Sequence, residues 1–256
     1  MVVMALDHAR DFLGLKAFNA TDLTKTTLSY FFTRWVTHFC APGFMLLAGS
    51  AAFLMQRSKP ELSRFLLTRG LWLVFAELTI INFAWTFSFA RPGLMVIWAL
   101  GWSMVLLAAL VWLPAPALAA VSLGTILLHN IFDGLQAGPL LDASGGLVGS
   151  AGDWALSVLH QKNSPLGFLV IFGRVPFFFY LLHLLLLHSM AVGLGVAQGF
   201  EWAQFISPFW KFPKAYGLSL GWVYVAWASA VLVLYFPSRW FAGLKTRRRD
   251  WWLSYL

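Results

Sequence analysis

Residues 94–113 read LMVIWALGWSMVLLAALVWL and contain no charged side chain. A helix needs about 20 mostly apolar residues to cross the hydrocarbon core of a bilayer, so this run predicts a transmembrane helix. The whole chain agrees, because 60% of its 256 residues are hydrophobic and only 11% are charged. A soluble domain is about half apolar and about one-quarter charged. The composition excludes a soluble globular domain and a disordered chain, and the single cysteine, Cys40, excludes a disulfide scaffold.

Further apolar runs lie on both sides of this segment. They predict an all-α, polytopic transmembrane helix bundle with six full spans, preceded by a truncated N-terminal span at residues 1–6. The six predicted spans are residues 39–55, 70–89, 94–113, 117–132, 176–196 and 218–236. We expect a single integral-membrane domain over residues 1–256. The chain shows no internal repeat of the kind found in many transporters.

The basic residues indicate how the chain is oriented in the membrane. There are 18 Lys and Arg against 10 Asp and Glu, and they lie between the apolar runs and in the C-terminal tail. The positive-inside rule explains this distribution better than nucleic-acid binding does, and it predicts a cytoplasmic tail. The sequence leaves open which side of the membrane each connection in the first half of the chain faces. Simple alternation of six spans places the basic connection 57–69 outside, which the rule disfavours.

The N-terminal motif LDHARDF, residues 6–12, carries ionisable side chains beside the first apolar run. Such groups within spans are costly and are candidates for function. On a continuing helix His8 and Asp11 share a face, as do Asp7 and Asp11. A carboxylate beside an imidazole orients the ring and raises its basicity, which suits a general base. The alternative is a charged helix end that lies among lipid headgroups.

Two histidine-containing segments supply further candidates. His38 begins a predicted span, and the loop before it is long enough to bring it to the N-terminal motif; otherwise it is an interfacial histidine. His129 and Asp133 lie at i and i+4 at the end of another span, next to Asn130. They either hold a substrate hydroxyl or cap the helix end.

The segment FGRVPFFFYLLH, residues 172–183, reads as a turn followed by a helix start, with Pro176 near the first helical position. Arg174 is placed to meet a phosphate or a lipid headgroup. His183 lies about two turns into the helix, where a lone histidine usually has a structural hydrogen bond. No metal site is predicted, because the six histidines include neither an HExxH motif nor a pair at i and i+4.

As a set, these motifs resemble the bacterial DUF1624 family, which is similar to the catalytic domain of heparan-α-glucosaminide N-acetyltransferase. The tail residues 240–242 (WFA) and 249–256 (RDWWLSYL) add to the resemblance. It implies a membrane-embedded N- or O-acetyltransferase with acetyl-CoA as the cytoplasmic donor substrate and no metal. The acetyl group would pass to an amino or hydroxyl group of a glycan or amino sugar on the far side of the membrane.

The resemblance also implies roles for the candidate residues. His8 would act as general base or transient acyl carrier, with Asp7 or Asp11 orienting it and His38 as a second imidazole. Arg174 would face the CoA phosphates. The catalytic set implied is His8, Asp7, Asp11 and His38. The substrate-binding set is His129, Asn130, Asp133, Arg174 and His183.

Two departures from the family pattern lead to further expectations. The chain begins inside the first span, and we expect additional helices near residues 160–166, so it is interpreted as shortened at both places. An odd number of missing helices would bring the basic tail and the connection 57–69 to the same, cytoplasmic side. The expected location is the bacterial plasma membrane, with lipid as a partner. An inactive paralogue or scaffold without catalysis is the alternative, and a small-solute transporter is a third hypothesis.

Overall fold

A computed structural model describes residues 1–16, 22, 24–54, 59–89, 93–128, 167–248, 250 and 253. The regular elements in these ranges are all helices, which confirms the predicted all-α class. The chain divides into two compact units. The first contains Met1–Phe44, Ile80–Arg91 and Val148–Leu256, and the second contains Met45–Thr79 and Pro92–Leu147. The single integral-membrane domain stays a prediction.

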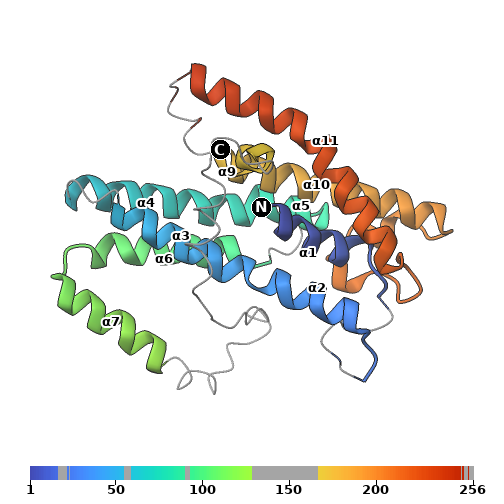
Figure 1. The fold of residues 1–256 in the computed structure, drawn as a ribbon, viewed down its shortest axis with the longest axis horizontal. Helices are drawn as coiled ribbons and strands as arrows, with labels where there is room; N and C mark the ends of the chain where they lie inside the picture. The colour runs from blue at the N-terminus through green and yellow to red at the C-terminus, as the bar shows by residue number, and fades with distance from the viewer. Residues whose placement is uncertain are drawn as a thin grey trace. The chain divides into compact units, whose positions relative to one another are not determined.

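The first unit is built around α1, which packs against both α10 and α11 (Figure 1). Its helices are α1 (Val2–Leu13), α2 (Leu28–His38), α5 (Asn82–Thr86), α9 (Val170–Arg174), α10 (Pro176–Ala197) and α11 (Leu220–Arg247). An apolar cluster joins α1, α9, α10 and α11, and is formed by Ala5, Phe172, Phe179, Val231 and Leu234. Close packing of this kind is the main force that associates helices in lipid. The unit therefore has its own core around α1.

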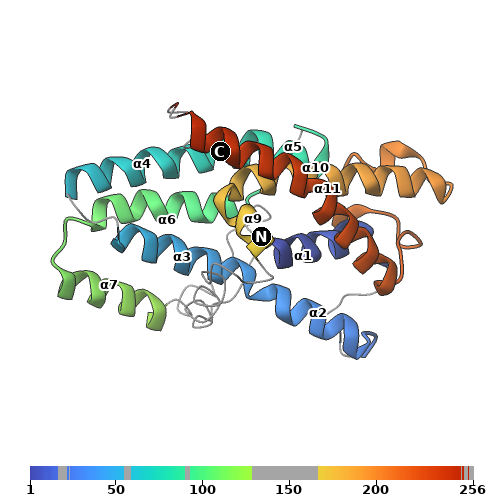
Figure 2. The ribbon, with the colours of Figure 1, turned by 45° about the horizontal axis from the view of Figure 1, so that its top comes forward.

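The second unit is centred on the pair α4 (Lys59–Ala76) and α6 (Val96–Leu110), which lie side by side in both views (Figures 1 and 2). Most of α3 (Cys40–Leu54) and all of α7 (Ala115–Leu128) also belong to it. A Cβ on Gly70 would lie 2.6 Å from the Gly101 carbonyl oxygen, and one on Gly101 would lie 2.8 Å from that of Gly70. Only glycine permits this approach, as at other close contacts between membrane helices.

Within the described residues, four helical stretches are long and apolar enough to cross a membrane: Leu28–Phe53, Pro60–Thr86, Pro176–Ala197 and Leu220–Arg247. The chain is therefore a membrane protein by its helices as well as by its composition. The predicted count of six spans is not confirmed. The predicted spans 94–113 and 117–132 correspond to the shorter apolar helices Val96–Leu110 and Ala115–Leu128. A turn at residues 111–114 separates these two helices, and residues 129–132 lie outside the described ranges.

Two predicted boundaries also change. The span predicted at residues 39–55 starts earlier, because the amphipathic stretch from Leu28 already forms α2 and continues into α3 after Phe39. The predicted N-terminal stub at residues 1–6 is the beginning of α1, which continues through the charged motif to Leu13. The ionisable side chains of that motif consequently lie on a helix and not beyond its end.

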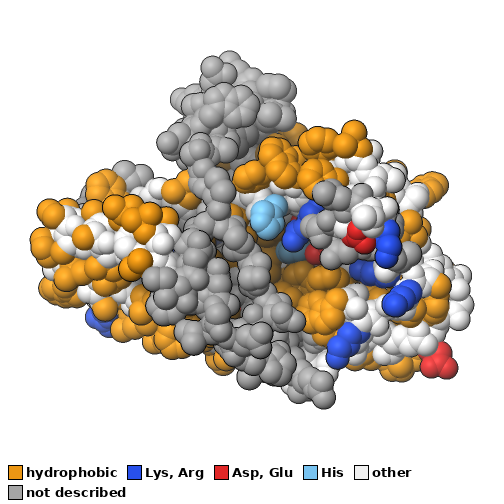
Figure 3. Space-filling model, turned by 90° about the horizontal axis from the view of Figure 1, so that it is seen from below, with side chains coloured by type: hydrophobic (Ala, Val, Ile, Leu, Met, Phe, Trp, Pro, Cys, Tyr) orange, Lys and Arg blue, Asp and Glu red, His pale blue; other side chains and the backbone are white. Residues whose placement is uncertain are grey.

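The surface carries many exposed apolar side chains, as expected for helices that face lipid. Phe53, Leu127 and Phe236 are 74%, 68% and 73% exposed. Figure 3 shows a face on which hydrophobic side chains predominate, while most of the visible charged side chains gather in one area.

Candidate functional site

The buried face of α1 positions the N-terminal motif. Ala5, Ala9 and Phe12 recur at helical spacing and are 2%, 0% and 0% exposed. The two alanines are small enough to let α10 and α11 approach the helix closely. His8 lies next to this face and is partly buried. The local sequence therefore places an imidazole at the contact between helices.

His8 is hydrogen bonded to His183 of α10. The His8 Nδ1 atom lies 2.6 Å from the His183 Nε2 atom, across 175 residues of sequence. The two rings are stacked, with centroids 4.9 Å apart and an interplanar angle of 7°. The other nitrogen of His183, Nδ1, lies 2.9 Å from the carbonyl oxygen of Phe179. The structure thus joins a predicted catalytic residue to a predicted substrate-binding residue.

Aromatic side chains enclose the histidine pair. Trp85 meets the His8 ring edge-on at 4.8 Å, and Tyr180 lies 5.9 Å from it. The Trp85 indole N–H donates to the Tyr180 hydroxyl over 3.4 Å. Both side chains belong to the buried core, at 5% and 6% exposed. Sequence analysis did not select them as site residues, because a buried aromatic in an apolar helix reads as packing.

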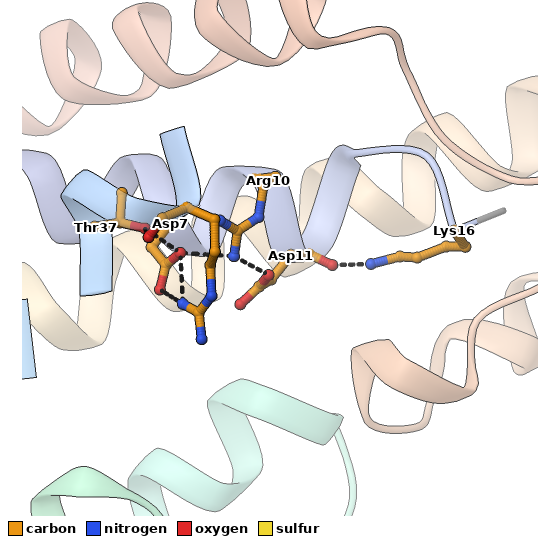
Figure 4. Close-up of polar contacts among 6 residues, drawn as sticks. Asp7, Arg10, Asp11, Lys16 and Thr37 are labelled. Carbon is orange, nitrogen blue, oxygen red and sulfur yellow. Dashed lines mark hydrogen bonds and ion pairs between the residues drawn. The ribbon is translucent and has the colours of Figure 1, made fainter. Parts of the chain in front are cut away.

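Three side chains bind the Asp7 carboxylate in the described part of the chain, and His8 is not one of them (Figure 4). Arg10 Nη2 lies 2.6 Å from Asp7 Oδ1, Arg34 Nη1 lies 3.1 Å from Oδ2, and the Thr37 hydroxyl donates over 2.7 Å. Asp7 therefore holds α1 against α2, which carries Arg34 and Thr37.

Asp11 pairs with the same guanidinium as Asp7. Its Oδ1 atom accepts from Arg10 Nη2 over 2.8 Å, and Arg10 itself is only 8% exposed. The described contacts of Asp7 and Asp11 are thus with cations and a hydroxyl. The sequence predicts that one of these carboxylates orients the His8 ring; in the structure, the imidazole of His183 is hydrogen bonded to His8 instead.

The other predicted site residues are not part of this cluster. His38 is exposed at the C-terminal end of α2 and forms no hydrogen bond with the described residues. Arg174 is exposed at the end of α9. His129, Asn130 and Asp133 lie outside the described residues. Among the described residues, there is no group of three or more His, Cys, Asp or Glu side chains that could hold a metal ion.

Lys16 extends the cluster beyond the end of α1. Its Nζ atom donates to the Asp11 carbonyl oxygen and lies 5.1 Å from the Phe209 ring centre and 5.5 Å from that of Phe212. Burial lowers the pKa of the Lys16 amine to about 8, and the charge of Asp11 partly opposes this shift. Sequence analysis missed Lys16, which no local motif marks.

A second buried histidine, His188, lies one turn and a half further along α10 and is fully buried. Its Nδ1 atom lies 3.0 Å from the Ala84 carbonyl oxygen, and its Nε2 atom lies 2.8 Å from that of Phe205. The ring stacks on Phe87 with centroids 3.9 Å apart. Both nitrogens of His188 thus contact the backbone and not another side chain.

Comparison with known proteins finds no matching family model, no matching curated protein and no matching solved structure. The resemblance to the DUF1624 family therefore depends on the sequence motifs. The geometry adds one independent fact, which is that the first of these motifs and the segment 172–183 meet at the His8–His183 pair.

Proposed function

We propose that the protein is a membrane-embedded acyltransferase that moves an acetyl group from acetyl-CoA to an amino or hydroxyl group of a glycan. The observation that carries this proposal is the hydrogen-bonded pair of His8 and His183. An imidazole fixed by a second group through one nitrogen, with the other nitrogen left for a reactant, is the usual arrangement of a general base or nucleophile.

Acetyl transfer requires one proton to move. As the acceptor nitrogen or oxygen attacks the thioester carbonyl, its new bond to carbon forms and the carbon–sulfur bond breaks. His8 takes the proton that the acceptor loses and returns it to the departing CoA thiolate. Alternatively, His8 first carries the acetyl group on its own nitrogen and then passes it to the acceptor. In both routes the same imidazole performs the chemistry.

The charged cluster beside the pair supports preorganisation of this base. The Asp7 carboxylate joins α1 to α2 through Arg34 and Thr37, and Arg10 bridges Asp7 to Asp11. A helix held in this way keeps its imidazole in one orientation, which lowers the entropic barrier to reaction. The exposed guanidinium of Arg174 is available to the CoA phosphates.

The proposed location is the bacterial plasma membrane, with the C-terminal tail in the cytoplasm. Lys245 and Arg247 lie in the last turn of α11, and the basic residues continue beyond it. Anionic lipid on the cytoplasmic side attracts such a segment. With the tail inside, the acetyl group travels outward from cytoplasmic acetyl-CoA.

The proposal is tested with purified protein in detergent, labelled acetyl-CoA and a panel of amino sugars. We expect transfer, and we expect His8→Ala to lower kcat at least about 100-fold, which is the usual contribution of a general base. Ser189→Ala is the matched control, because Ser189 is exposed on α10 and bonds only within its own helix. Wild-type protein that is well folded and transfers nothing would contradict the proposal and favour the scaffold hypothesis.

A further inference from the structure

The contacts of His183 fix which of its nitrogens carries a hydrogen. A carbonyl oxygen can only accept a hydrogen bond, so the 2.9 Å contact with the Phe179 oxygen requires a hydrogen on His183 Nδ1. A neutral imidazole has only one N–H, so His183 Nε2 carries a lone pair and acts as an acceptor. His183 has therefore no nitrogen left for a substrate, and at 1% exposure it has no access to one.

The same reasoning continues to His8. Its Nδ1 atom lies 2.6 Å from the His183 Nε2 lone pair, so His8 Nδ1 must carry the hydrogen and donate it. The neutral His8 ring then has its lone pair on Nε2. None of the hydrogen bonds within the described part of the chain uses His8 Nε2. This atom is the one left to meet a reactant.

We propose that His183 is a positioning residue that sets the tautomer of His8 and makes His8 Nε2 the reactive nitrogen. The role of His8 Nε2 as base or acyl carrier rests on the proposed function, whereas the tautomer itself does not. A buried imidazole anchored to a backbone carbonyl here takes the place that a carboxylate has in many other acid–base sites. This assignment replaces the substrate-binding role predicted for His183 from sequence.

A neutral partner has a different consequence from a carboxylate. A carboxylate favours the protonated state of a histidine by its charge, whereas neutral His183 orients His8 without adding negative charge. The Asp7 and Asp11 charges nearby are engaged by Arg10 and Arg34. His183 thus orients the His8 ring without placing a charge beside it.

The tautomer can be measured without any enzymatic assay. Protein labelled with 15N at histidine is studied in detergent at mildly alkaline pH, where 15N chemical shifts separate protonated from unprotonated ring nitrogens. We expect both His8 and His183 to carry hydrogen on Nδ1, with His8→Ala and His183→Gln providing the assignments. A hydrogen on His8 Nε2 would overturn the inference, whether or not the protein transfers acetyl groups.

Activity provides the second test, with two variants of the same position. The oxygen of Gln in His183→Gln reaches the place of Nε2 and still accepts from His8, whereas His183→Leu removes the acceptor. We expect kcat to fall about 100-fold for His183→Leu and by less than about tenfold for His183→Gln, with the KM for acetyl-CoA unchanged in both. A rise in KM with kcat unchanged would instead indicate substrate binding and overturn the inference.

Two controls separate these outcomes from loss of structure. Each variant is checked by size-exclusion chromatography and thermal unfolding in detergent, beside Ser189→Ala. If His183→Leu fails to fold, His183→Gln still decides: folded His183→Gln with a lone pair on His8 Nδ1 would overturn the inference. If wild type transfers no acetyl group but shows the expected tautomers, the proposed function fails and the inference about His183 stands.

Discussion

His183 and His188 are both buried on α10, yet their surroundings give them different properties. His183 uses one nitrogen for a backbone carbonyl and the other for the ring of His8. His188 faces two carbonyl oxygens, those of Ala84 and Phe205, and stacks on Phe87. One histidine is linked to a second titratable side chain and the other ties three parts of the backbone together. Burial alone therefore does not identify a functional histidine; its partners do.

The largest expected effect separates these two roles through stability. His188→Leu removes the side chain that contacts two buried carbonyl groups from different segments, so we expect it to lower the free energy of unfolding by about 3 kcal/mol. His183→Leu removes one contact with a carbonyl that also belongs to a helix, together with the acceptor of the His8 hydrogen, and we expect a smaller loss of about 2 kcal/mol. The measurement is unfolding in detergent by SDS titration. A larger loss for His183→Leu would contradict the structural role assigned to His188.

The next effect tests the surroundings of His188 through Phe205. A Cβ on Gly195 would overlap the Phe205 ring, which is 0% exposed and whose carbonyl faces His188. Overpacking of this kind costs about 2 kcal/mol, so Gly195→Ala should unfold more readily than wild type. Gly193→Ala is the matched control on the same helix, because nothing lies within 4 Å of its Cβ position. Equal stability of the two variants would show that Phe205 is free to move.

The smallest effect concerns pH. Lys16 lies over Phe212, whose ring is also 6.1 Å from that of His188. The pKa of Lys16 is about 8 in the folded protein, against 10.5 when it is unperturbed, so the unfolded chain binds more protons between these values. The contribution of Lys16 to the free energy of unfolding should therefore rise with pH from about 8 to about 10.5. Lys16→Met should flatten this rise; an unchanged slope would contradict the assigned shift.

The helical class and the membrane location could be predicted from sequence, because apolar runs and few charges are properties of composition. His8 and His183 could also be selected, since ionisable residues in apolar segments stand out. Their pairing could not be predicted, because it depends on α1 and α10 packing together across 175 residues. No periodicity within either segment contains that information.

In two other places the structure differs from what the local sequence indicates. Asp7 lies beside His8, which suggested a carboxylate–imidazole pair, but Arg34 and Thr37 on another helix bind Asp7 more directly. The stretch from Leu28 is amphipathic and contains Arg34, so hydropathy alone did not include it in a span, although it forms part of Leu28–Phe53. In the case of Asp7, a contact between helices decided the outcome.

Because the partners of α1 lie at different distances along the sequence, its contacts form at different times during synthesis. The Trp227 indole donates to the Val2 carbonyl oxygen across 225 residues, which a ribosome takes about 10 to 45 seconds to translate at about 5–20 residues per second. Thr37, in contrast, follows Asp7 by only 30 residues. Residues of α2 can therefore pair with Asp7 early in synthesis. His8 cannot pair with His183 until α10 has been made. The imidazole pair can form only after residue 183 has been made, later than the contacts between α1 and α2 and earlier than those between α1 and α11.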